Sequence, residues 1–99
     1  RNAIEAQGTE NFPTAAGKKL YGELTMIVTV NHDGRVLETE IVESSGNRLL
    51  DKRAAAIARN AGPFGAFTAG MRRQADQIVV ASRLKFTRDE TLQTQLSGQ

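Results

Sequence analysis

Few residues of this chain have side chains suited to chemistry. The only histidine, His32, is followed by Asp33, and such a pair can serve as a general base with an orienting carboxylate. A catalytic site also needs a nucleophile within reach, and no candidate nucleophile accompanies this pair. Because Gly34 comes next and tolerates a positive φ, His32-Asp33-Gly34 is typical of a hairpin turn. We therefore expect no catalytic residue here.

The serine, glycine and metal-ligand patterns also point away from an enzyme. Ser44-Ser45-Gly46 lacks the G-x-S-x-G of a nucleophile elbow, and the dispersed glycines form neither a P-loop nor a dinucleotide fingerprint. The chain contains no cysteine, which excludes a disulfide, a thiolate zinc site and a cysteine nucleophile. One histidine without a carboxylate cluster predicts no metal site. We predict no cofactor and no enzymatic activity.

Composition excludes further classes of protein. A chain of 99 residues suits one domain, 1–99, with a single modest core. Thirteen basic and eleven acidic residues are scattered, whereas nucleic-acid binders usually show a clustered basic face, so we expect no nucleic-acid partner. No apolar run reaches the roughly 18 residues of a membrane span. The sequence opens at Arg1 without a signal-peptide pattern, and we expect it to be an excised domain with an anchor upstream.

Alternating apolar residues predict a β-hairpin over residues 22–43. In the first strand, Gly22 to Asn31, every second residue is apolar and faces a core. These positions are Leu24, Met26, Val28 and Val30. The second strand, Arg35 to Glu43, changes phase midway, which a β-bulge around Leu37 and Glu38 explains.

A long amphipathic helix is predicted over residues 48–61. Asn47 suits the N-cap, and the negative charge of Asp51 suits the first turn. Gly62 and Pro63 then end the helix. Its apolar stripe consists of Leu50, Ala54, Ile57, Ala58 and Ala61. The small alanines allow this helix to lie close to a sheet.

The other segments give shorter patterns. Residues 1–20 predict a short helical segment, with one helix over Arg1 to Gln7 stopped by Gly8 and a brief second helix begun by Pro13. The stretch from Pro63 to Met71 predicts a loop whose Phe64 and Phe67 contact the core.

Residues 77–87 predict the last strand. One face carries Ile78, Val80, Leu84 and Phe86, interrupted by Ser82, and the other carries Val79, Ala81, Arg83 and Lys85. Thr87-Arg88-Asp89-Glu90 has the form of a capping box. Residues 88–96 therefore predict a short closing helix with Leu92 and Leu96 on one side.

Together these elements predict an α+β fold. A right-handed strand–helix–strand connection places the last strand beside the first. The expected core is a three-stranded antiparallel sheet in the order 2-1-3, with the long helix on one face and short terminal helices. Both outer strands would then be edges, and an extended peptide can add to such an edge.

An ordered set of short motifs resembles the C-terminal domain of TonB, the periplasmic energy transducer of Gram-negative bacteria. The resemblance covers roughly Phe12 to Phe86. Its motifs are Asn11-Phe12-Pro13-Thr14-Ala15-Ala16, Tyr21-Gly22, Asp33-Gly34-x-Val36, Ser44-Ser45-Gly46, Leu50-Asp51-x-x-Ala54, Ala61-Gly62-Pro63-Phe64, Arg72-Arg73 and Asp76.

The resemblance implies a binding function without catalysis. Such domains take the TonB box, a short segment of an outer-membrane receptor, as a strand added beside their last strand, and they transmit energy for the import of iron complexes or other nutrients. By analogy, the binding positions are Ile78, Val79, Val80, Ala81, Ser82, Arg83, Leu84, Lys85 and Phe86, with Glu10 and Asn11 secondary. Arg72 and Arg73 are further candidates, because interfaces favour arginine.

The resemblance also implies where the domain works. It would be the periplasmic part of an inner-membrane-anchored protein that reaches a proton-channel complex (ExbB/ExbD) through its missing N-terminal part. Two alternatives stay open. One is a TolA-like C-terminal interaction domain, against which the Ser-Ser-Gly … Leu-Asp-x-x-Ala run argues. The other is a self-associating structural module or homodimer, because a free edge can pair with itself.

Overall fold

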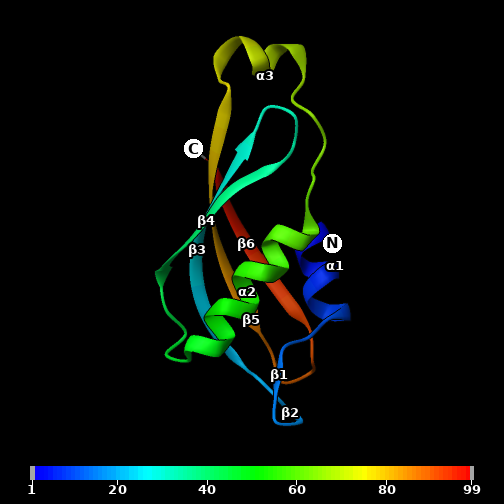
Figure 1. The fold of residues 1–99 in the computed structure, drawn as a ribbon, viewed down its shortest axis with the longest axis vertical. Coiled ribbons are helices and arrows are strands. Elements are labelled where there is room, and N and C mark those ends of the chain that lie inside the picture. The colour runs from blue at the N-terminus through cyan, green and yellow to red at the C-terminus, as the bar shows by residue number, and fades with distance from the viewer. Residues whose placement is uncertain (1, 99) are drawn as a thin grey trace.

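The computed structural model describes residues 2–98, so the expected helix start at Arg1 lies outside the described residues. The elements are α1 (Ala3–Glu10), β1 (Thr14–Ala15), β2 (Lys18–Lys19), β3 (Gly22–Asn31), β4 (Val36–Glu43), α2 (Arg48–Ala61), α3 (Ala69–Gln74), β5 (Gln77–Phe86) and β6 (Leu92–Gly98). Four strands form an antiparallel sheet in the order β4-β3-β5-β6, and β1 and β2 form a separate small hairpin (Figure 1).

The main sheet has four strands, one more than the sequence predicts. The order β4-β3-β5 corresponds to the predicted 2-1-3, but β6 adds a fourth strand beside β5. Residues 92–98 are therefore not part of a closing helix. Leu92 and Leu96 are four residues apart, a spacing that places side chains on one face of a strand as well as of a helix. The apparent capping box is a turn, in which the Glu90 N–H donates to the Thr87 carbonyl at 2.9 Å.

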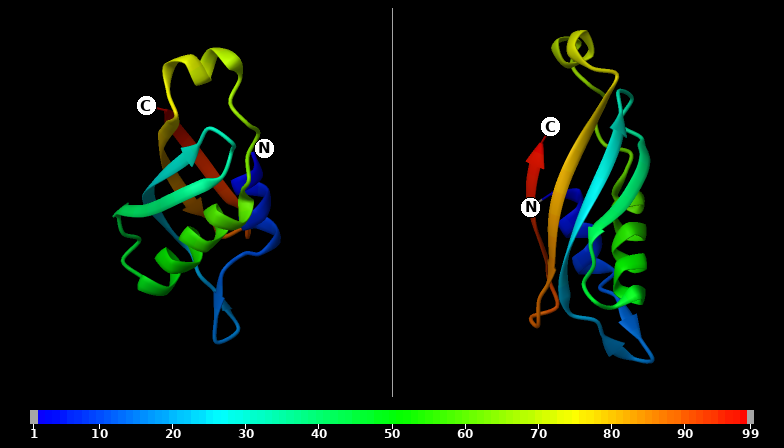
Figure 2. Two further views of the ribbon diagram at one scale, coloured as in Figure 1. Left: turned by 45° about the horizontal axis from the view of Figure 1, so that its top comes forward. Right: turned by 90° about the vertical axis from the view of Figure 1, so that its left-hand side faces the viewer.

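The helix α2 occupies the residues at which the sequence predicts it. The Asn47 side chain accepts hydrogen bonds from the N–H groups of Leu49 and Leu50, at 2.9 and 3.1 Å. Four of the five residues of its apolar stripe are buried: Leu50, Ala54, Ile57 and Ala58. They contact the buried β3 residues Leu24, Met26, Val28 and Val30 in a single hydrophobic core. Helix α1 lies on the same side of the sheet and contacts α2 and β6 (Figures 1 and 2).

The strand β4 carries two bulges. The register with β3 skips Leu37 and Val42, so the predicted bulge around Leu37 is present and a second one follows. Both extra residues turn toward solvent, with 47% and 44% of their surfaces exposed. Among the described residues no strand pairs with the outer side of β4, so β4 is an edge of the sheet.

The loop between α2 and α3 is attached to the β3–β4 turn. The Phe64 N–H donates to the Gly34 carbonyl at 2.7 Å, and the Phe67 N–H donates to the His32 carbonyl at 2.8 Å. Gly34 has φ +90°, and a Cβ there would lie 1.8 Å from the Phe64 oxygen. No other residue fits this turn, because both the backbone conformation and the close contact require glycine.

The N-terminal segment differs from the prediction. Helix α1 continues through Gly8 to Glu10, and Gly8 is buried against Leu92 rather than ending the helix. No helix begins at Pro13. The chain there forms the β1–β2 hairpin, with Ala16 and Gly17 at positive φ in its turn. Helix α3, at the far end of the molecule, was not predicted.

Candidate functional site

The central candidate is β5, which carries nine of the predicted binding residues. Along one side it pairs with β3 over its whole length, from Gln77 to Phe86. Its side chains alternate between the two faces of the sheet. Ser82, Leu84 and Phe86 are buried on the helix-covered face, while Arg83 and Lys85 lie on the uncovered face. A partner that adds to β5 must therefore be recognised largely through backbone groups.

The outer side of β5 is not the free edge that the sequence predicts. Strand β6 pairs with it in an antiparallel register that runs from Phe86 opposite Leu92 to Val80 opposite Gly98. The remaining residues of β5, Gln77 to Val79, continue toward α3 beyond the described end of β6 (Figure 2). The position at which a partner strand would pair is thus occupied by the chain itself.

Side chains of α1 bind the outer backbone groups of β6. The Thr94 N–H donates to Glu5 Oε2 at 2.8 Å, and the Leu92 N–H donates to Thr9 Oγ1 at 3.2 Å. Asn2 Nδ2 also donates to Thr94 Oγ1 at 2.7 Å. The Thr94 N–H bond holds the pKa of Glu5 below its usual value, against a smaller opposing effect of burial. Since Leu92 and Thr94 direct their N–H groups outward, those of Gln93 and Gln95 point toward β5.

Among the β6 residues whose burial is described, 92–95, only Leu92 is buried. Leu92 is 3% exposed and contacts the core, whereas Gln93 and Gln95 are exposed. A Cβ on Gly8 would lie 2.2 Å from Leu92 Cδ2, so α1 and β6 meet there without room for a side chain. Over residues 92–95, buried Leu92 and the side-chain bonds at Leu92 and Thr94 therefore connect β6 to α1, in addition to its pairing with β5.

An apolar cavity of about 310 Å³ lies over the α3 end of β5, on the helix-covered face. Its walls include Ile4 of α1 and Phe64 and Phe67 of the loop, and its floor includes Val80 and Ser82. Ser82 is 1% exposed, and its hydroxyl has no hydrogen-bond partner among the described residues. The helix α2 covers only part of the sheet (Figure 1), and none of its residues is among those that line the cavity.

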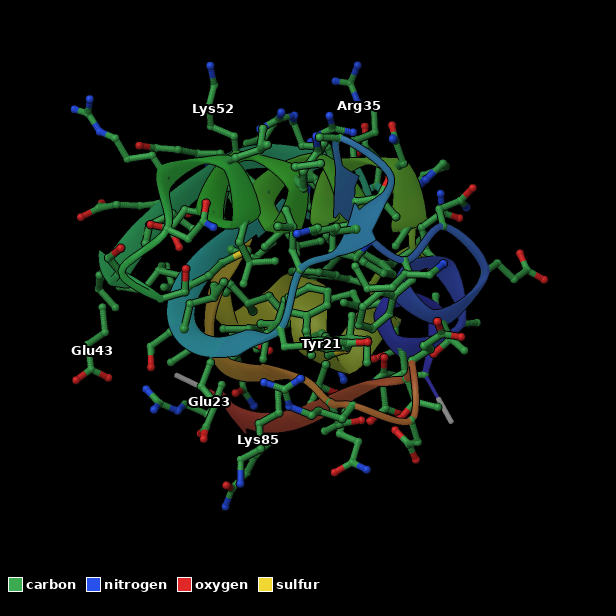
Figure 3. The ribbon with its side chains drawn as sticks, turned by 90° about the horizontal axis from the view of Figure 1, so that it is seen from below. Tyr21, Glu23, Arg35, Glu43, Lys52 and Lys85 are labelled. Carbon is green, nitrogen blue, oxygen red and sulfur yellow. The ribbon has the colours of Figure 1, made fainter. Side chains whose placement is uncertain are left out.

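The uncovered face of the sheet is charged. Arg83 bridges Glu23 at 3.3 Å and Glu43 at 3.2 Å, and it donates to Thr25 Oγ1 at 2.9 Å. In Figure 3, Glu23 and Lys85 point away from α2, on the side opposite Lys52. Because these pairs are well exposed to solvent, each adds little to stability.

The other predicted binding residues lie apart from one another. Arg72 and Arg73 are exposed on α3, where Arg72 pairs with Asp76. Glu10 and Asn11 lie at the C-terminal end of α1. The structure therefore brings neither pair together with the middle of β5.

Metal-ligating side chains do not gather in the part of the chain that the structure describes. Residues 2–98 contain no group of three or more His, Cys, Asp or Glu side chains placed to hold a metal ion. His32 lies in the β3–β4 turn, and its backbone groups bond to Asp76 and Phe67. Within the same residues, no helix has the length and apolar character to cross a membrane.

The antiparallel sheet and the helices packed on it define a small α+β domain. Residues 11–87 match the family described as the C-terminal domain of the Gram-negative bacterial TonB protein, and the chain belongs to this family. Comparison with curated proteins and with solved structures gave no match. Membership makes this a TonB-like periplasmic domain of energy transduction, from a non-catalytic family that interacts with outer-membrane receptors.

The residues that hold β6 were not predicted from the sequence. Glu5, Thr9, Leu92 and Thr94 act through hydrogen bonds and contacts between segments more than 80 residues apart in the sequence. The family match itself ends at residue 87, so it gives no guidance for β6. The one available signal was the alternation of Leu92, Thr94 and Leu96 with glutamines, a pattern with the period of a strand.

Proposed function

We propose that this domain binds the TonB box of outer-membrane receptors by adding it as a strand to β5, in the place that β6 occupies. In this proposal the full protein is anchored in the inner membrane and receives energy from a proton-channel complex (ExbB/ExbD). The domain passes that energy to the receptor for the import of iron complexes or other nutrients. These proposed functions are more specific than the general role that membership of the family gives.

The observation that carries the proposal is the pairing of β5 with β6. Val80 to Phe86 already accept an antiparallel strand along their outer side. That strand is the last of the sheet, and Gln93 and Gln95 leave it partly exposed. A peptide of similar length can form the same backbone bonds, since those bonds do not depend on side-chain identity.

The free-energy change on exchanging β6 for a peptide strand is expected to be close to zero. Each backbone hydrogen bond contributes about 0.5–1.5 kcal/mol net, and the bonds gained with the peptide replace those lost with β6. The peptide also loses conformational freedom on binding. We therefore expect moderate affinity and ready release, which suits a connection that must form and break repeatedly.

An NMR titration of the ¹⁵N-labelled chain with a receptor TonB-box peptide tests the proposal. We expect shifts along Val80 to Phe86 and changes in the β6 signals from Gln93 to Gly98, with no change on adding a scrambled peptide. Intermolecular NOEs to β5 would establish strand addition. The absence of shifts at millimolar peptide, in a folded and monomeric sample, would contradict the proposal. A size that increases with concentration would favour self-association instead.

A further inference from the structure

The register of β6 places a glycine beside the apolar cavity. Gly98 is paired with Val80, which forms part of the cavity floor. Glycine has no side chain to enter this space. At the position paired with Val80, the chain's own strand therefore completes the backbone pairing without adding a side chain to the cavity.

We propose that this cavity is an anchor site for a large apolar side chain of the peptide strand that replaces β6. The anchor residue is the one that pairs with Val80, in the position of Gly98. This inference rests on strand addition at β5, and it adds a side-chain preference to an interaction otherwise made through the backbone.

Strand geometry directs the anchor side chain to the cavity. Residues directly opposite each other in an antiparallel pair point to the same face, with Cβ atoms about 4.5–5.5 Å apart. Val80 lines the cavity, so a residue paired with it projects on the cavity side. The next residue along the strand, paired with Val79, projects to the uncovered face.

The size and chemistry of the cavity define the side chain it would accept. A cavity of about 150 Å³ holds benzene, and this one has about 310 Å³, which is sufficient for leucine, isoleucine or phenylalanine. Apart from Asn2 at the α1 end and the hydroxyl of Ser82, the side chains that line it are apolar. A charged side chain would lose its hydration there without gaining an ion pair, so Asp, Glu, Lys and Arg are disfavoured.

The anchor gives a peptide an advantage over β6. Because the backbone exchange is nearly balanced, partial burial of one leucine in place of Gly98 is enough to favour the incoming strand about tenfold. For the same reason, a leucine placed on β6 itself would hold that strand more tightly.

The test uses the full chain with Gly98→Leu and, as a matched control, Ser97→Leu, whose position pairs with Ala81 and projects to the uncovered face. We expect Gly98→Leu to slow hydrogen exchange at the Gln93 and Gln95 amides about tenfold, and to raise the Kd of a TonB-box peptide by a similar factor. Ser97→Leu should change neither. Equal behaviour of the two variants would overturn the inference.

A second pair of variants asks whether the cavity is responsible. Val80→Phe fills the cavity from its floor, and Gly98→Leu should then give no further protection. Val79→Phe, on the uncovered face, should leave the effect of Gly98→Leu intact. If Val80→Phe does not remove that effect, the cavity is not the anchor site.

The two proposals fail in different ways. If the wild-type chain binds no peptide, strand addition is wrong, while the exchange rates still decide whether the cavity accepts a side chain. If the peptide binds and both leucine variants behave alike, strand addition stands and the anchor is wrong. If 1-hexanol binds to the cavity equally well in wild type and in Gly98→Leu, the leucine does not occupy the cavity. The cavity would then be a site for a small molecule, and the inference of an anchor site would be overturned.

Discussion

At the scale of single residues, two carboxylates hold backbone segments in place. Glu5 accepts the Thr94 N–H of β6, and Asp51 accepts the Ser45 N–H at 2.9 Å and the Ser45 hydroxyl at 2.7 Å at the start of α2. Hydrogen bonds to an ionised acceptor are stronger than those between neutral groups. Glu5 therefore joins α1 to β6, and Asp51 joins α2 to the segment that precedes it.

Replacing Glu5 by glutamine tests its role in holding β6. Glutamine keeps a hydrogen-bond acceptor but loses the charge, so we expect a loss of about 1 kcal/mol in this contact. Amide exchange at Gln93 and Gln95, measured by NMR, should become about fivefold faster, and the TonB-box peptide should bind more tightly. Glu10→Gln, at the exposed end of α1, is the matched control. Unchanged exchange in Glu5→Gln would show that Glu5 does not hold the strand.

Asp51 should make stability depend on pH. Burial raises its pKa, but hydrogen bonds from the Ser44 hydroxyl and from Ser45 outweigh this and hold the pKa below 3.8. A lowered pKa means that the ionised form favours the folded state, so its contribution is full above pH 3.8 and is lost as pH falls through the folded pKa. Asp51→Asn should lower the free energy of unfolding by about 1–2 kcal/mol at pH 7.

Urea denaturation of Asp51→Asn and wild type at several pH values checks this prediction. The difference between them should shrink below pH 3.8. Glu38→Gln, an exposed carboxylate on β4, serves as the control and should show no such trend. A difference that is constant from pH 7 to pH 3 would contradict the assigned role of the Asp51 charge.

At the scale of elements, the contact between α1 and β6 explains why Gly8 lies inside a helix. Glycine usually weakens a helix interior by about 1 kcal/mol relative to alanine. Here Leu92 occupies the space that a side chain would need. The glycine therefore allows β6 to lie against α1, and its role becomes visible only when the two ends of the chain are placed together.

Gly8→Ala tests whether helix propensity or the contact with Leu92 has the larger effect at this position. The new Cβ would meet Leu92 Cβ at 2.9 Å and Leu92 Cδ2 at 2.2 Å, and such overpacking typically costs about 1–3 kcal/mol. We expect faster amide exchange across β6 even though alanine favours the helix. Gly70→Ala in α3 is the matched control, because its nearest atom beyond the backbone is 3.8 Å away. If both variants leave β6 protected, the proposed steric role of Gly8 is wrong.

The same elements show how far sequence reasoning reaches. The β3–β4 hairpin and α2 could be predicted, because their periodicity, N-cap and turn glycine all agree. β6 could not, because Leu92 and Leu96 fit a helix and a strand equally well. What decides between them is pairing with β5 and the bonds from α1, which are contacts between distant residues. The strand β5 was therefore predicted, whereas the strand that covers it was not.

At the scale of the whole molecule, the sheet has one edge that is open and one that is covered. On the β4 side, bulges at Leu37 and Val42 and three glutamates (Glu38, Glu40 and Glu43) discourage pairing with another chain. On the other side, β6 covers β5, and α1 binds the outer N–H groups of β6. In our proposal, strand addition at β5 requires β6 to leave, so β6 would regulate access to the proposed binding strand.

Hydrogen exchange of the full chain with saturating TonB-box peptide is the most direct test of this account. We predict that the Gln93 and Gln95 amides lose their protection when the peptide binds, while the β3 amides that pair with β5 stay protected. A scrambled peptide should change neither set. If the peptide binds and both β6 amides keep their protection, the peptide occupies another surface, and the exchange of β6 for a receptor strand is contradicted.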